Sequence, residues 1–145
     1  MKGIRRLLFV ACIIHLAACV PVCGRFPRLP GIDGVVTTAG TPVVGIRVAL
    51  VSVNRNESCS NASAWVTSDD SGRFRIAPVM KNVEMVPLFP GDAFYLYQLC
   101  LQPRDGRVLS WRMRGHVNHV PLNVAVTCDL ARSDQQLCEE GKELW

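Results

Sequence analysis

Apolar and polar positions alternate in short runs along most of the chain, and turn residues separate one run from the next. The alternation has the period of two that is typical of β-strands, and no convincing helical pattern follows residue 33. The sequence therefore predicts an all-β fold, a sandwich or a barrel, and not an alternating α/β enzyme fold. Seven runs are expected to be strands: residues 34–38, 43–53, 65–67, 74–76, 94–101, 107–113 and 121–128.

The run over residues 43–53 is apolar on both of its faces. Val48 and Leu50 share one face, whereas Ala49 and Val51 share the other. A strand with one face in solvent would carry polar residues on that face. The pattern therefore predicts a central strand that is covered on both sides.

A turn rich in polar residues is predicted to join residues 65–67 to residues 74–76 as a hairpin. Gly72 in this turn can adopt the positive φ that a tight reversal needs. Asp69 and Asp70 are interpreted as turn residues, because a calcium loop needs further oxygen ligands at alternating positions.

A second hairpin is predicted from two β-prone runs, residues 94–101 and 107–113. They flank the sequence Pro-Arg-Asp-Gly, which is a strong turn signal. The preceding residues 78–93 contain three prolines and are expected to be irregular.

The N-terminus has the three parts of an export signal. Lys2, Arg5 and Arg6 are basic, residues 7–14 are apolar, and small residues follow. The apolar stretch is shorter than the roughly 20 residues that a bilayer-spanning helix needs. Residues 1–18 are therefore predicted to be a cleaved signal peptide.

The sequence Leu-Ala-Ala-Cys at the end of this signal resembles the bacterial lipobox. The resemblance implies that Cys19 is acylated and becomes the first mature residue, so that membrane lipid is a partner. Val20 in the next position resembles outer-membrane sorting, which implies a periplasm-facing protein of the cell envelope. The alternative is an ordinary secretory signal that is cleaved a few residues later and leaves Cys19 as a thiol.

Composition divides the remaining chain and excludes one class of partner. The division is a flexible tether at 19–32, which is rich in Pro and Gly, a β-sandwich domain at 33–128 and a polar C-terminal tail at 129–145. The whole chain has 16 basic and 12 acidic residues, and the signal removes three basic ones. A nearly neutral mature protein lacks the basic surface that nucleic acid requires, so no nucleic-acid partner is expected.

The mature chain beyond Cys19 has five cysteines, which are expected to form disulfides because an exported protein meets an oxidising compartment. Cys59 is paired with Cys100 and Cys128 with Cys138 in the favoured arrangement, which leaves Cys23 free. Other pairings stay possible on the sequence alone. The cysteines lack metal-site spacing, and no metal or cofactor is expected.

Two stretches of the chain, residues 34–48 and 67–74, resemble the carboxypeptidase regulatory-like domain of the transthyretin-like group. The matching features are a Gly-x-Pro turn at residues 40–42 and an Asp-x-x-Gly-x-Phe turn that ends at Phe74. The resemblance implies a seven-stranded transthyretin-like or immunoglobulin-like β-sandwich. One related group, the hydroxyisourate hydrolases, uses a first-strand histidine and a C-terminal Tyr-Arg-Gly-Ser, and this chain has neither.

No catalytic set is predicted. His116 and His119 are expected in an exposed loop without a ligand role, and the adjacent Glu139 and Glu140 are expected to point apart. The sequence thus predicts a lipid-anchored envelope module that binds or supports without catalysis, with an envelope protein or glycan as partner. Two alternatives stay open: an accessory lipoprotein of a secretion or surface-assembly machine, and an undetected periplasmic hydrolase.

Overall fold

The fold is all-β, as the sequence predicted. It is described from a computed structural model, which places residues 24–83, 94–117, 119–133 and 136–144. The expected signal peptide, Cys19 and Cys23 lie outside these described residues. Two short 3-10 turns, η1 (Val53–Arg55) and η2 (Cys59–Asn61), follow β4.

Thirteen strands occur in the described residues, more than the seven expected, because several two-residue strands add to the longer ones. They are β1 (Gly24–Leu29), β2 (Gly31–Thr38), β3 (Thr41–Pro42), β4 (Arg47–Ser52), β5 (Val66–Thr67), β6 (Arg73–Ile76), β7 (Val79–Val83), β8 (Phe94–Tyr95), β9 (Tyr97–Gln102), β10 (Leu109–Arg112), β11 (His116–Val117), β12 (Asn123–Asp129) and β13 (Cys138–Leu144).

The larger sheet has five strands in the order β13-β12-β2-β3, and β6 pairs with β2 beside β3. Its centre is a parallel pair, β2 with β12, in which Gly31 opposes Asn123 and Thr37 opposes Asp129. All other strand pairs described here are antiparallel. The parallel pair joins segments far apart in sequence, which is why alternation alone did not indicate it.

The second sheet has the order β10-β9-β4-β5. The predicted hairpin around residues 103–106 is confirmed, because β9 and β10 pair directly across that turn. The predicted central strand is confirmed as well, since β4 lies between β9 and β5 in this sheet. The strand begins only at Arg47, because Gly45 has a φ of +80° and breaks the run that starts at Val43.

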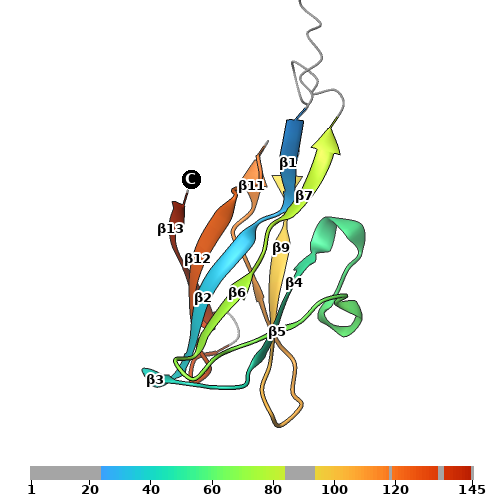
Figure 1. The fold of residues 1–145 in the computed structure, drawn as a ribbon. Helices are drawn as coiled ribbons and strands as arrows, with labels where there is room; N and C mark the ends of the chain where they lie inside the picture. Colours follow the sequence, from blue (N-terminus) through green and yellow to red (C-terminus); the bar gives the residue numbers. More distant parts are fainter. Residues whose placement is uncertain (1–23, 84–93, 118, 134–135, 145) are drawn as a thin grey trace, which may run out of the picture.

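The two sheets, drawn in Figure 1, face each other, and their side chains form one common hydrophobic core. Ile32 and Val124 enter it from the five-stranded sheet, and Val48, Leu99 and Tyr97 enter it from the four-stranded sheet. Each of these side chains is at most 1% exposed. Burial of a large apolar side chain contributes about 1.5–3 kcal/mol, so this core is the main source of stability.

Two small ribbons lie at one end of the molecule, formed by β1 with β7 and by β8 with β11. Figure 1 shows β1, β7 and β11 at the end opposite β3. Residues 24–32 were expected to be a flexible tether, but they form β1 and the start of β2. Pro27 is compatible with β1 because this strand has a partner on one side, where the register also shifts.

Two further expectations from the sequence were wrong. Residues 65–67 and 73–76 do not pair as a hairpin, because β5 joins β4 in one sheet and β6 joins β2 in the other. The turn between them is tight, as expected, but it connects the two sheets. The polar C-terminal tail at 129–145 was expected to follow the last strand, but it contributes β13 to the edge of the five-stranded sheet.

Candidate functional site

The outer face of the four-stranded sheet is covered by the segment that follows β4. Cys59, Ala62 and Trp65 in this segment pack on Ala49 and Cys100 in a second small hydrophobic cluster, which also contains Val51. The second apolar face of β4, noted in the sequence, is therefore explained by this cover. We call residues 53–65 the cover segment.

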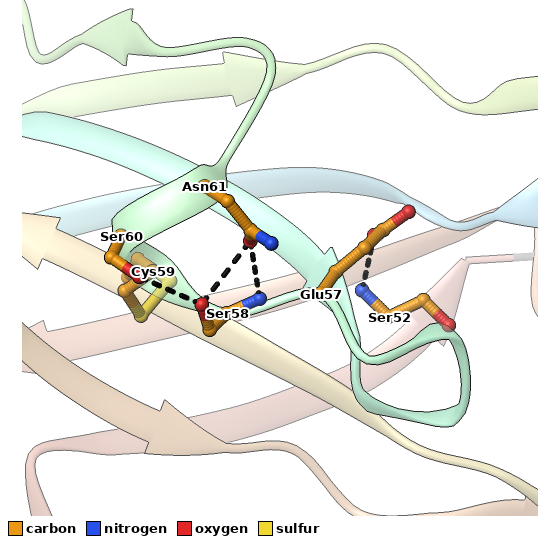
Figure 2. Close-up of a disulfide and its surroundings, with 7 residues drawn as sticks. Ser52, Glu57, Ser58, Cys59, Ser60 and Asn61 are labelled. Carbon is orange, nitrogen blue, oxygen red and sulfur yellow. Dashed lines mark hydrogen bonds between the residues drawn. A yellow bond between two sulfur atoms is a disulfide. The ribbon is translucent and has the colours of Figure 1, made fainter.

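A disulfide fixes the cover segment to the sheet. Cys59 is bonded to Cys100 of β9, with a Cα–Cα distance of 5.5 Å. Figure 2 shows the local hydrogen bonds: the Ser58 N–H donates to Asn61 Oδ1 at 2.6 Å, and the Ser52 N–H donates to Glu57 Oε2 at 2.8 Å. Asn61 thus acts in turn formation.

Further contacts hold both ends of the cover segment. Asn54 accepts a hydrogen bond from the Leu96 N–H at 2.8 Å and donates to the Phe94 carbonyl at 2.6 Å. At the other end, the Arg47 guanidinium lies 4.7 Å from the centre of the Trp65 ring. The segment is held at several points, so its role in this structure is to cover the sheet.

The second disulfide joins Cys128 of β12 to Cys138 of β13, with a Cα–Cα distance of 4.0 Å. Both disulfides are the pairs favoured from the sequence. Asp129 follows directly and accepts hydrogen bonds from the Ala39 and Ala131 N–H groups at 2.9 and 3.0 Å. The hydrogen bond from Ala131, followed by that from Ala39, lowers the pKa of this carboxyl.

The outer face of the five-stranded sheet is open and carries a hollow of about 740 Å³. Small side chains form its floor: Val35 of β2, Ala125 and Thr127 of β12, and Gly141 of β13. Arg73 and Arg75 of β6 stand at one side of it. We call this feature the sheet hollow.

The sheet hollow is lined by two acidic residues, Asp33 and Asp69, and two basic ones, Arg73 and Arg75, but only one ion pair joins them. Arg75 forms an ion pair with Asp33 at 2.7 Å, and a second contact of 3.3 Å makes the pair bidentate. Asp69 is occupied by its own turn, because its Oδ1 accepts the Ser71 and Arg73 N–H groups at 2.8 and 2.9 Å. The Arg73 guanidinium has no ion-pair partner in the described part of the chain. The hollow can therefore hold an extended polar ligand that carries an acceptor or a negative charge for this guanidinium.

The sequence did not indicate this hollow, although one signal was present. Arg73 and Arg75 alternate with the buried Phe74, which places both arginines on the outer face of β6. Phe74 lies directly opposite Gly34, and its ring covers the space that a Gly34 side chain would occupy. The long-range pairing of β6 with β2 was needed to bring Asp33 to Arg75.

A second hollow lies where the edges of β10 and β13 approach each other. Trp111, Arg114, Glu139 and Glu140 are among its lining residues. The Arg114 N–H donates to Glu140 Oε1 at 2.5 Å, while Glu139 pairs with Arg132. Glu139 opposes Thr127 and Glu140 opposes Val126, so the two carboxylates are on opposite faces of β13. This confirms that they point apart.

Of the two histidines, His119 lines neither hollow. His116 belongs to the short strand β11, opposite Tyr95, and not to a loop as expected. His119 is exposed. Within the described ranges, no group of three or more His, Cys, Asp or Glu residues is placed to hold a metal ion.

Among the described residues, Tyr97 has a buried side-chain oxygen without a hydrogen-bond partner. Tyr97 is 1% exposed, and its hydroxyl forms no hydrogen bond with any described residue. Burial, followed by the nearby Tyr95, raises the pKa of this phenol well above its usual value of 10.0.

No helix in the described residues is both long and apolar enough to span a membrane. The chain matches no family model, no curated protein and no solved structure.

Proposed function

We propose that this chain is a lipid-anchored module of the bacterial cell envelope that binds a partner without catalysing a reaction. The observation that carries the proposal is the lipobox-like Leu-Ala-Ala-Cys sequence, which follows a basic and an apolar region at the distance expected of a signal peptide. Acylation of Cys19 would make membrane lipid the first partner. The residue after it, Val20, favours the outer membrane, with the domain facing the periplasm.

Two structural features support export and a scaffold role. The disulfides Cys59–Cys100 and Cys128–Cys138 suit an oxidising compartment. The two sheets around one core are consistent with the transthyretin-like sandwich that the sequence resembles, and the Gly-Pro and Asp-Gly turns of that resemblance lie at connections between strands. Such residues specify a scaffold and do not supply a reactive group.

The sheet hollow is the proposed binding face for an envelope protein or glycan. It combines a floor of small side chains with the Arg73 guanidinium, which forms no ion pair in the described part of the chain and can donate hydrogen bonds to an extended partner with acceptor groups. The binding energy would come from several such contacts, because one exposed charge contributes little by itself.

Two comparisons test this proposal. After a high-salt wash that removes proteins bound only by charge, membrane fractionation of cells should find the wild-type chain with the membrane and the Cys19→Ser variant in the soluble fraction; equal distribution of the two after this wash would refute the anchor. In vivo crosslinking should give a specific adduct that Arg73→Glu removes and Arg104→Glu, a matched change at an exposed arginine outside the hollow, retains. An adduct pattern that both variants share would refute the sheet hollow as the binding face.

A further inference from the structure

Exposed apolar side chains gather at the end of the molecule where the described chain begins. Large apolar side chains with high exposure in the described ranges are Phe26 (42%), Val79 (43%), Met80 (37%), Phe94 (49%), Leu122 (43%), Val44 (42%) and Val108 (47%). The first five lie on or beside the ribbons at this end. Val44 and Val108 lie toward the opposite end, near the turn after β9.

The backbone pairings place these five residues at the same end of the fold, with Phe26 and Met80 on opposite faces of the β1–β7 ribbon. Phe26 is on β1 and Met80 is on β7, which pair with each other. Phe94 pairs with Val117 in the neighbouring ribbon. Leu122 precedes β12, and its carbonyl accepts the Gly31 N–H at 2.8 Å, two residues after β1 ends.

The β1–β7 ribbon is also basic. Arg25, Arg28 and Lys81 are exposed, and neither strand contains an acidic residue. Phe26 lies directly opposite Lys81, so an apolar and a basic side chain are paired across the ribbon. Basic residues beside exposed aromatic and aliphatic ones suit the interface of an anionic bilayer, where the apolar groups enter and the charges meet lipid phosphates.

The ribbon is a sheet of its own in the described structure, because β1 and β7 hydrogen-bond only to each other. An isolated two-stranded sheet is marginally stable in water, and its apolar side chains gain by being covered. The chain itself indicates what covers them. Gly24 is five residues after Cys19, a span of at most about 18 Å in a fully extended chain.

We infer that the end formed by the β1–β7 ribbon, with Phe94 and Leu122, is seated on the headgroup region of the bilayer. This inference extends the proposed lipid anchor, and it rests on that proposal for the location of the protein at a membrane. This contact would orient the domain, with the β1–β7 end, at the top of Figure 1, on the bilayer and the turn after β9 pointing away from it into the periplasm. The sheet hollow would then lie on a side wall and stay accessible.

The first experiment measures how strongly this surface binds to membranes when the chain carries no acyl groups. The mature chain with Cys19→Ser is mixed with vesicles of phosphatidylethanolamine that contain about a quarter phosphatidylglycerol, and with vesicles of phosphatidylcholine alone. Cosedimentation should show binding to the anionic vesicles that weakens with salt. Replacing Arg25, Arg28 and Lys81 by Gln should lower the partition coefficient about fivefold for each side chain. The double variant Phe26→Ser/Met80→Ser should lower it about tenfold or more.

Matched changes at the other end control for general effects. The variant Val44→Ser/Val108→Ser has the same type and number of substitutions and should bind as wild type. Circular dichroism and thermal melts establish that each variant is folded. Equal loss in both double variants, or no binding to either vesicle by the folded Cys19→Ser chain, would overturn the inference. Self-association that Phe26→Ser abolishes, without vesicle binding, would assign the surface to a second copy and would also overturn it.

The second experiment uses the acylated chain in vesicles that contain a photoreactive phospholipid. Crosslinks should map to peptides that contain residues 24–29, 79–83 and 94–95. Crosslinks spread evenly over the domain would contradict a seated end while leaving the anchor intact. Failure of acylation would refute the anchor alone, because the first experiment does not require lipid at Cys19.

Discussion

Removal of the Cys59–Cys100 disulfide provides a quantitative test of the cover segment. The substitution Cys59→Ala opens the bond at the more exposed cysteine and leaves Cys100 as a buried thiol, which behaves as a small apolar side chain. The bond closes a loop with a sequence separation of 41. In the chain-entropy model a loop of this length contributes about 4 kcal/mol.

The second disulfide provides the matched comparison. Cys128–Cys138 closes a loop with a separation of only 10, for which the same model gives about 3 kcal/mol. Cys138→Ala should therefore lower the free energy of unfolding by about 1 kcal/mol less than Cys59→Ala. Both losses are large against a total stability of about 5–15 kcal/mol for a domain of this type.

Urea denaturation followed by circular dichroism measures both effects. The midpoint should fall more for Cys59→Ala, and the m-value should rise because the unfolded chain is less constrained. A loss below about 1 kcal/mol for Cys59→Ala would refute the reasoning. So would a larger loss for Cys138→Ala, since loop length would then not determine the order.

Three further predictions concern single side chains. Tyr97→Phe should raise the free energy of unfolding by about 1 kcal/mol in urea titrations, because it removes a buried hydroxyl without a partner; a loss of more than about 1 kcal/mol would show that the hydroxyl is satisfied. Above pH 10.0 the Tyr97 phenol stays protonated in the folded chain but ionises in the unfolded chain. The free energy of unfolding of the wild type should therefore fall with pH by up to about 1.4 kcal/mol per pH unit from this group. An equally steep fall with pH in Tyr97→Phe would contradict this. Gly72→Ala should lower the free energy of unfolding by more than about 2 kcal/mol in thermal melts, because φ is +70° and the new Cβ would meet the Val36 carbonyl and the Val43 nitrogen. Gly106→Ala, with a φ of +81° in open space, should lower it by about 1 kcal/mol. Equal losses for the two variants would refute the role of the contact.

Local patterns were sufficient for the parts of the fold that depend on neighbours in sequence. The two apolar faces of β4 predicted a strand covered on both sides, and the turn at residues 103–106 predicted the hairpin of β9 and β10. The spacing of the cysteines, with the compartment, favoured the two disulfide pairs that the structure contains.

Pairing between distant segments could not be predicted in the same way. The parallel contact of β2 with β12 places Gly31 and Ile32 inside the sheet, although the prolines around them suggested a tether. β13 contains several residues of low β-propensity, including Glu139 and Gly141, and forms because β12 offers an edge and the Cys128–Cys138 bond holds it there.

The candidate binding face depended on the same long-range pairing. Arg73 and Asp69 were read as parts of a turn, and Asp69 does have that role. The hollow arises because that turn crosses from one sheet to the other, which brings β6 and its two arginines beside Asp33 of β2. A sequence pattern gives the face of a strand but not the strand beside it.

Intact mass spectrometry of the chain purified from bacterial membranes is the decisive experiment on the lipid anchor. We expect a polypeptide that begins at Cys19 and carries the added mass of a diacylglycerol, with or without a third acyl chain. Alkylation without reductant should modify one thiol, Cys23, and alkylation after reduction should modify four more. A chain that begins after Cys19, or one that begins at Cys19 with the mass of the unmodified polypeptide, would contradict the lipid anchor.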